Sequence, residues 1–159
     1  MFTLSDMTTF AWAFLITLPL TLVIHAGGHA FFAWLFGGKA KLTLGKGKVV
    51  FSLRGFELRG FYFIDAACYY GTLRKDKRWK HALIYAGGPL FNILSIFLVN
   101  GLIHLDILPT HMFFYQFVYF SIYFLFFSLL PIDYGKDNPS DGKAIYEVLR
   151  FGKVYQDFS

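Results

Sequence analysis

The chain has 159 residues, of which 56% are hydrophobic and 21% aromatic, and its mean hydropathy is +0.49. Only 16% of its residues are charged, against about 25% in an ordinary soluble domain. A water-soluble enzyme, a disordered tail and a disulfide-built secreted module are therefore poor interpretations, and the length suits one domain.

Three long runs contain no Lys, Arg, Asp or Glu, at about residues 10–36, 82–103 and 112–132. In a helix, each run is long enough to cross a hydrocarbon core of about 30 Å. Because the residues before the first run include Asp6 but no Lys or Arg, we do not expect that run to be a cleaved signal peptide. The sequence predicts an all-α integral membrane protein with three transmembrane helices, as one membrane-embedded domain over residues 1–159.

The basic residues are unevenly distributed. Eleven of the 15 Lys and Arg fall in the loop 38–81 and the other four in the tail 133–159, so the turn 104–111 has none. The positive-inside rule predicts a multi-pass protein of the cell membrane, with that loop and the C-terminal tail cytoplasmic and the N-terminus outside. The net charge of +5 requires no nucleic acid partner, because topology and the anionic headgroups of the lipid bilayer account for it.

Apolar and polar residues alternate over residues 40–64, within the basic loop. This period of two, interrupted by several glycines, predicts a short β-ribbon between the first and second spans. Since an open strand edge is not tolerated in lipid, we expect the ribbon to lie at the membrane surface.

His25 and His29 lie within the first apolar run. Their spacing of four residues puts both imidazoles on one face of a helix, one turn apart, where both can bind one divalent ion. Two ionisable residues inside a span are costly, which favours a functional site over two hydrogen-bonded polar residues. A third ligand must come from elsewhere, and Asp133, Asp137 and Asp141 after the third run are chemically equal candidates.

Three short motifs follow one another along the chain: HAGGH at residues 25–29, GPLFN at 88–92, and LP at 130–131 followed by DG at 141–142. In this order they resemble the His-Glu-x-x-His, Gly-Pro-x-x-Asn and Leu-Pro plus Asp-Gly elements of the site-2 protease family of intramembrane zinc metalloproteases. The ribbon also has a counterpart in that family. The resemblance covers nearly the whole chain and departs from the family at the Glu.

This resemblance implies a Zn²⁺ site made by His25, His29 and Asp141, since only Asp141 among the candidate carboxylates is followed by glycine. It implies that Asn92 binds the substrate backbone or stabilises an oxyanion, although an interhelical hydrogen bond explains this amide equally well. Gly88 and Pro89 are expected to kink the second span near the site.

The substrate implied by the family is a transmembrane segment of another protein or a remnant signal peptide. Such a segment must unwind, and an edge of the ribbon could capture it by strand addition. The small size is typical of a prokaryotic minimal enzyme.

Ala26 stands where the family has its general base, a Glu that accepts and delivers the proton of the attacking water. Losing a general base typically costs about 10²- to 10⁴-fold in rate. We therefore expect an inactive form of a zinc metalloendopeptidase, either a natural pseudoprotease or, as the intact remainder of the motifs favours, a Glu-to-Ala variant that holds substrate. The alternative function is a non-catalytic membrane pseudoprotease that binds metal or a client and regulates it.

Overall fold

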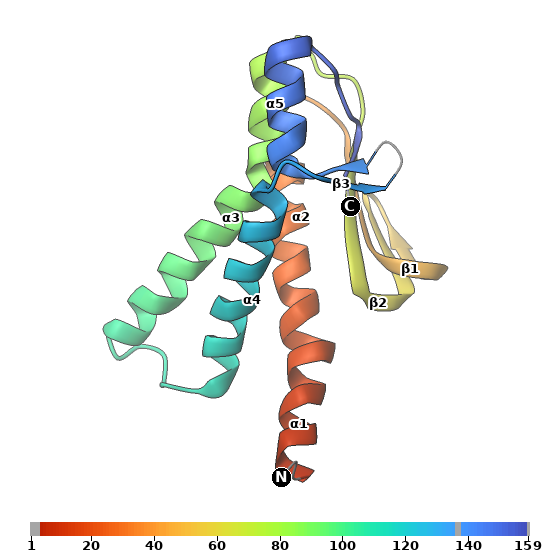
Figure 1. The fold of residues 1–159 in the computed structure, drawn as a ribbon. Coiled ribbons are helices and arrows are strands. Elements are labelled where there is room, and N and C mark those ends of the chain that lie inside the picture. Colours follow the sequence, from red (N-terminus) through yellow and green to blue (C-terminus); the bar gives the residue numbers. More distant parts are fainter. Residues whose placement is uncertain (1–3, 136–137, 159) are drawn as a thin grey trace.

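Residues 4–35 form one long helical rod in the computed structural model, which describes residues 4–135 and 138–158 (Figure 1). The rod consists of α1 (Leu4–Trp12), a π-helical segment η1 (Ala13–Thr17) and α2 (Leu18–Leu35). Pro19, in the first turn of α2, has no N–H to continue the regular ladder of hydrogen bonds. The π turn directly precedes this point, where the ladder must change.

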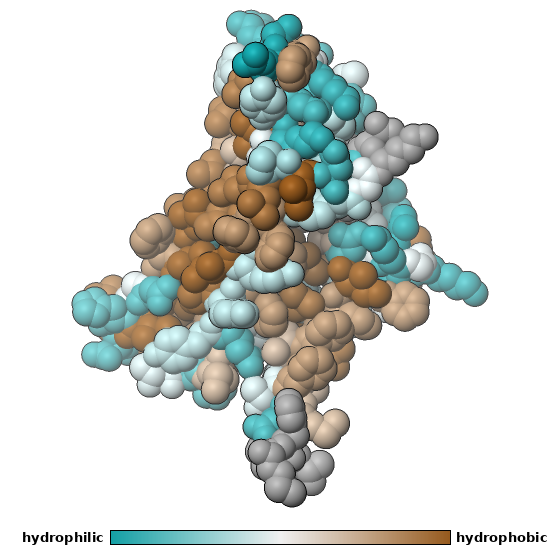
Figure 2. All heavy atoms as spheres, in the orientation of Figure 1, coloured by the Kyte–Doolittle hydropathy of each residue, from teal (hydrophilic) through white to brown (hydrophobic). Residues whose placement is uncertain are grey.

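Two further helices, α3 (Arg78–His104) and α4 (Met112–Leu129), lie beside the rod. With the helix over Asp6–Leu35, they are the three helices in the described residues that are long and apolar enough to cross a membrane. The three spans predicted from sequence are therefore confirmed by length and composition. Figure 2 shows a hydrophobic belt over the bundle, with hydrophilic residues gathered above it around α5 and at the far end of α3.

Glycines set the contact between α2 and α3. A Cβ on Gly28 or on Gly87 would lie closer than 3.0 Å to backbone atoms of the other helix, so only glycine allows this approach. Helix α3 bends part-way along its length (Figure 1). Pro89 lies within this helix and has no N–H to donate to the carbonyl of Tyr85, which explains a bend. The close packing expected of small residues in spans is found at Gly28 and Gly87, whereas Gly27 has open space beside it.

The loop between the first two spans forms a sheet larger than the sequence predicted. Its strands are β1 (Ala40–Leu53), β2 (Phe56–Tyr70) and β5 (Asp157–Phe158), antiparallel in the order β1-β2-β5. The ribbon extends beyond residue 64 because β2 continues through Ala66 to Tyr70, where apolar and polar residues no longer alternate. With strands of 14 and 15 residues, the all-α description must be corrected to a helical bundle with two small sheets in the described residues, one of three strands and one of two.

The sheet folds back on itself. Residues 42–44 pair both with residues 66–68 and with residues 56–58, while residues 49–53 pair with 56–59. Gly45 and Gly47, with φ of 88° and 94°, lie between the two paired parts of β1. These left-handed conformations are accessible to glycine at little cost, and they allow the strand to turn sharply enough to fold over.

The C-terminal segment returns to the end of the bundle far from the N-terminus (Figure 1). A small hairpin of β3 (Asp133–Gly135) and β4 (Asn138–Pro139) leads into α5 (Asp141–Phe151), which ends at Gly152 in the left-handed conformation. A buried core then joins α2, β2, α3, α5 and the tail, and it contains Ala33, Tyr70, Ile84, Tyr85, Ala144, Val148 and Tyr155. This core fixes α5 against α3, and with it the first residue of α5.

Candidate metal centre

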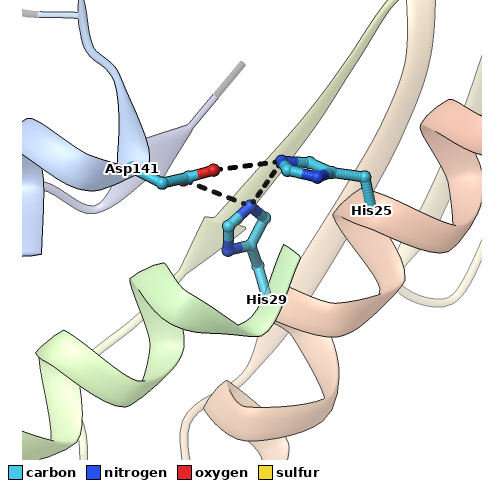
Figure 3. A group of neighbouring side chains, drawn as sticks. All are labelled: His25, His29 and Asp141. Atoms are coloured by element: carbon cyan, nitrogen blue, oxygen red, sulfur yellow. Dashed lines mark hydrogen bonds and ion pairs between the residues drawn. The ribbon is translucent and has the colours of Figure 1, made fainter. Parts of the chain in front are cut away.

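His25, His29 and Asp141 point toward one another, the two histidines from α2 and the aspartate from the start of α5 (Figure 3). The Nε2 atom of His25 lies 3.1 Å from one carboxylate oxygen of Asp141, and the Nε2 atom of His29 lies 3.4 Å from the other. The two Nε2 atoms are 3.2 Å apart. One ligand atom from each residue lies within 4.8 Å of the others, so a single ion can contact all three.

Ser140 determines where Asp141 lies, because its side chain joins the start of α5 to the end of α4. Its hydroxyl oxygen accepts from the backbone N–H groups of Lys143 (3.2 Å) and Ile132 (3.3 Å), and its proton goes to the carbonyl of Leu130. The serine is thus the N-cap of α5, and Asp141 is the first helical residue. With 6% of its surface exposed, Asp141 is not part of a solvent turn.

Steric constraints explain why glycine follows Asp141, at position 142. A Cβ on Gly142 would lie 2.7 Å from the carbonyl carbon of Leu129, so a side chain would push α5 away from α4. Asp133, the competing ligand candidate, is exposed and pairs with Lys143 instead. Asp137 lies outside the described residues. Of the two described candidates, Asp141 is the one brought to the histidine pair.

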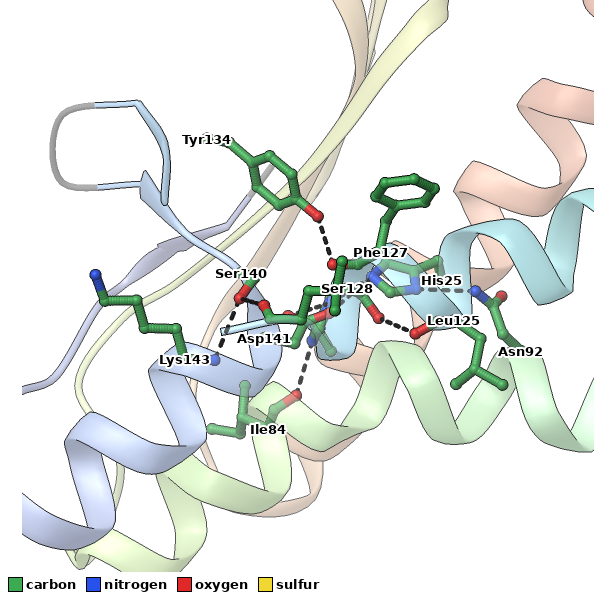
Figure 4. A network of polar contacts seen from close by, with 12 residues as sticks. His25, Ile84, Asn92, Leu125, Phe127, Ser128, Tyr134, Ser140, Asp141 and Lys143 are labelled. Carbon is green, nitrogen blue, oxygen red and sulfur yellow. Dashed lines mark hydrogen bonds and ion pairs between the residues drawn. The ribbon is translucent and has the colours of Figure 1, made fainter. Parts of the chain in front are cut away.

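The Nδ1 atoms of both histidines also have partners, and Figure 4 shows the contact between His25 and Asn92. The Nδ1 of His29 lies 2.8 Å from the carbonyl oxygen of Ile84, which can only accept, so Nδ1 carries the proton and the lone pair of Nε2 faces His25 and Asp141. The Nδ1 of His25 lies 3.0 Å from the side-chain nitrogen of Asn92. Such contacts fix the ring orientation and tautomer of a metal-binding histidine.

The amide of Asn92 can form a hydrogen bond with either neutral tautomer of His25. In one orientation of the amide its nitrogen donates to Nδ1, and the Nε2–H of His25 then points at the carboxylate of Asp141. The Oδ1 atom of Asn92 is buried and has no hydrogen-bond partner among the described residues. A half-turn of the amide would place this oxygen on Nδ1–H and leave the Nε2 lone pair for an ion, which is the tautomer that a metal ligand requires.

Asn92 and Gly88 therefore contact the histidines themselves. Asn92 is fully buried behind His25, which gives it a positioning contact, while its role toward a substrate oxyanion stays a prediction. A Cβ on Gly88 would lie 2.5 Å from the Nε2 of His29 and 2.6 Å from that of His25. The missing side chain thus leaves free the space beside the ligand atoms that an ion would need.

A cavity of about 390 Å³ opens beside the three ligands, between α2, α4 and the sheet. The sheet contributes Lys46 and Asp65, which form an ion pair of 2.9 Å. No sequence pattern pointed to either residue, because they come together only when β1 folds over. The position of Lys46 between Gly45 and Gly47 was the local feature of the sequence that distinguished it from the other lysines.

Tyr134 and Ala26 limit the acid–base chemistry of this cavity. Burial, together with the nearby charge of Asp141, raises the pKa of Tyr134, so its phenol keeps the proton that it donates to the carbonyl of Phe127 (2.6 Å). Ala26 is only 1% exposed and is not among the described residues that line the cavity. A carboxylate at this position would need new space to reach the site.

Comparison with known proteins agrees with the membrane assignment. No protein-family model matches the chain. Over 156 residues, it is 51% identical to the uncharacterized membrane protein YwmF of Bacillus subtilis, and the match covers 98% of each protein. The chain belongs to the YwmF family of membrane proteins. As a member of the YwmF family with three helices able to span, it is a multi-pass membrane protein.

A second Asp–His pair in this YwmF-family protein is built differently. The Nε2 of His81 lies 2.6 Å from Asp76, and its Nδ1 lies 2.8 Å from the hydroxyl of Tyr70. That hydroxyl is also 2.8 Å from the carbonyl of Tyr155 and 3.1 Å from the hydroxyl of Tyr85. The position of His81 next to the second apolar run predicts a residue near the membrane interface, and the structure shows that its side chain is buried in the protein. We call this group, Tyr70, Asp76, His81, Tyr85 and Tyr155, the tyrosine clasp.

Proposed function

We propose that this protein binds Zn²⁺ through His25, His29 and Asp141 and holds an extended segment of another membrane protein in the adjoining cavity without cutting it. It would be a non-catalytic relative of the site-2 proteases. The observation that carries the proposal is the convergence of three ligand atoms within 4.8 Å at the edge of a cavity.

Two features favour zinc as the ion. Two imidazole nitrogens and one carboxylate oxygen form a donor set that suits Zn²⁺, and three protein ligands are the number found in zinc sites with an open position. The residues also fit the ion, since Gly88 leaves space at both Nε2 atoms and Asn92 has a buried, unpartnered oxygen that a half-turn of its amide would bring to His25. When bound, zinc would supply Lewis-acid polarisation of a ligand oxygen.

The residues around the cavity support holding rather than cutting. Hydrolysis needs a group that accepts a proton and passes it on, and Ala26 has none. Asp65 is already paired with Lys46, and Asp141 is needed as a ligand. Because the phenol of Tyr134 stays protonated, the described cavity lining offers no unengaged base.

A client in extended conformation fits the sheet side of the cavity. Residues 64–66 of β2 line it, and β5 pairs only with Cys68 and Tyr69, just beyond them. In the described residues, the β5 side of 64–66 therefore has no strand partner. A client segment could continue the β5 position there, replacing the helical hydrogen bonds it loses on unwinding. The side of the membrane follows from the positive-inside rule and belongs to the proposal.

The first test is the zinc content of the purified full chain in detergent. We expect about one zinc per chain, lost in His25→Ala and Asp141→Ala. Gly88→Ala should also lose it, because a Cβ there meets both Nε2 atoms, while the matched variant Gly27→Ala, which has open space, should keep it. Absence of zinc from the parent chain after loading would reject the metal site.

The variant Ala26→Glu distinguishes a protein that only holds a client segment from a protease that lost its activity at this one residue. Because Ala26 is buried away from the cavity, we expect a variant that binds zinc and still does not cleave single-span membrane proteins. Restored cleavage, abolished again by His25→Ala, would instead make the chain a protease silenced at one residue.

Client holding is tested by a photo-crosslinking amino acid at Ile64, next to the cavity, and at Val50 on the far part of the sheet as a control. Membrane proteins captured at Ile64 but not at Val50 would support the proposal. Equal capture at both positions would contradict it.

A further inference from the structure

A second cavity, of about 400 Å³, lies where α2 ends and α3 begins. Its walls include Trp34 and Gly37 at the end of α2, Arg74 and Lys75 in the following loop, and Lys80 in the first turn of α3. Gly37 has φ of 80°, and a Cβ on it would lie 3.1 Å from the Cβ of Arg74. A glycine is therefore needed for the loop to dock here and form the cavity.

The cavity is cationic. Arg74, Lys75 and Lys80 have no carboxylate within 4.0 Å among the described residues, and neighbouring Asp76 is bound to His81. The ammonium group of Lys80 lies 5.3 Å from the ring centre of Phe36 at the cavity wall, which holds it in place. Three positive charges thus meet at one hollow without a counter-ion from the protein.

The helix that begins beside this cavity, α3, has positive charges at its N-terminal end, where they destabilise a helix. The N-terminal end of α3 carries Lys77, Arg78 and Lys80, has no acidic residue in its first turn and has no side-chain cap. Cations are unfavourable at the positive end of a helix dipole, where acidic residues are normally found. Residues that are unfavourable for local stability are typical of functional sites. An anion bound in the cavity would reduce the repulsion between these cations and the positive end of the helix dipole.

The surroundings of the cavity indicate the source of the anion. Trp34 is 71% exposed, and Leu35 next to it at the end of the span Asp6–Leu35 is exposed as well. Trp79, in the first turn of α3, is also exposed, and its ring centre lies 5.4 Å from that of Phe36. Exposed indoles at the end of a span are typical of the headgroup level of a bilayer. We propose that this cavity binds the phosphate of an anionic phospholipid, whose acyl chains pack on the apolar surface next to Trp34. A soluble phosphate has the same charge but makes no use of this surface.

The test uses the full chain in neutral detergent and native mass spectrometry with added phosphatidylglycerol or phosphatidylcholine. We expect saturable binding of phosphatidylglycerol and at least about tenfold weaker binding of phosphatidylcholine. Arg74→Gln/Lys75→Gln should weaken phosphatidylglycerol binding by roughly tenfold or more. The control, Lys48→Gln/Arg54→Gln, removes the same charge from exposed positions on the sheet and should leave it unchanged.

Unchanged zinc content and melting temperature without lipid will show that the variants are folded, and Lys80→Gln serves as an independent third variant. Equal binding of the two lipids, or an equal loss in the control variant, would overturn the proposal. Inorganic phosphate separates the two sources of the anion. If millimolar phosphate alone stabilises the chain as strongly as phosphatidylglycerol and displaces it, the ligand is a soluble anion and the lipid assignment is wrong.

Discussion

The metal centre and the tyrosine clasp both place a histidine ring between a carboxylate and a second polar group, yet they differ in what their nitrogens face. In the clasp, both nitrogens of His81 are used by protein partners, Asp76 and Tyr70. In the metal centre, the Nδ1 atoms of His25 and His29 contact Asn92 and the carbonyl of Ile84, and the Nε2 atoms converge with each other and with Asp141 beside a cavity. A histidine whose two nitrogens face opposite partners holds a fold together, whereas two Nε2 atoms that converge with a carboxylate beside a cavity indicate a ligand site.

The two clusters also sit at opposite ends of the same helix. Asp141 begins α5, and the tail that follows α5 brings Tyr155 into the clasp. The clasp thus ties the far end of α5 to β2 and α3, while Ser140 fixes its near end to α4. The comparison predicts that changes in the clasp alter stability and that changes in the metal centre alter binding.

The largest difference is expected between the two aspartates. Asp141→Ala removes a ligand and should lower the affinity for zinc by more than about 100-fold, beyond the loss seen when an outer partner is removed. Asp76→Ala removes the exposed carboxylate of the clasp and should leave zinc affinity unchanged. Competition with a chromogenic chelator measures both. Similar losses in the two variants would end the distinction between the clusters.

Asn92 provides the next test, because it touches only the outer nitrogen of His25. Asn92→Ala should weaken zinc binding by roughly 10- to 100-fold. Asn92→Asp keeps an oxygen that accepts from Nδ1–H and should restore most of the affinity. The control is Asn100→Ala, since Asn100 is exposed and bonds only to the carbonyl of Ile96 among the described residues. A loss in Asn92→Asp as large as in Asn92→Ala would argue against the positioning role.

Parts of this structure were predictable because their signals are local. The spans follow from apolar runs, and the histidine pair follows from a spacing of four residues. Asp141 required the resemblance to a known family, because spacing alone did not separate it from Asp133 and Asp137. Its burial depends on Ser140 and Gly142, whose contacts with α4 no local pattern shows.

Other parts depend on contacts between distant residues. Tyr70 and Tyr155 are 85 positions apart, so no periodicity relates them, and no local pattern predicts that His81 is buried beside Tyr70. Lys46 and Asp65 reach the cavity only because β1 folds over at two glycines. The alternation over residues 40–64 predicted strands but not the fold-over, since the pairing of residues 42–44 on both sides is a tertiary property.

Tyr70→Phe tests the clasp itself. The change deletes a buried hydroxyl next to His81, Tyr85 and the carbonyl of Tyr155, and it should lower the free energy of unfolding by about 1–2 kcal/mol. Zinc affinity should change by less than about threefold, because distant sites are nearly additive. Chemical denaturation in detergent and zinc titration measure the two effects. A large loss of zinc binding would mean that the clasp controls the position of Asp141.

The smallest effect is expected at alkaline pH. Burial, reinforced by nearby Tyr85, raises the pKa of Tyr70 in the folded protein, whereas in the unfolded chain it should be near its ordinary value of about 10. The folded state thus holds this proton more tightly. Its contribution to stability is complete below about pH 10 and is lost as the pH rises further, by at most about 1.4 kcal/mol per pH unit. Lysines with a raised pKa in the folded protein, such as Lys143, also make the protein less stable as the pH rises. The pH dependence of the wild type alone therefore does not isolate the contribution of Tyr70. Tyr70→Phe keeps those lysines, and its stability should therefore fall less steeply than that of the wild type above pH 10; parallel slopes would show that this proton plays no part in the clasp.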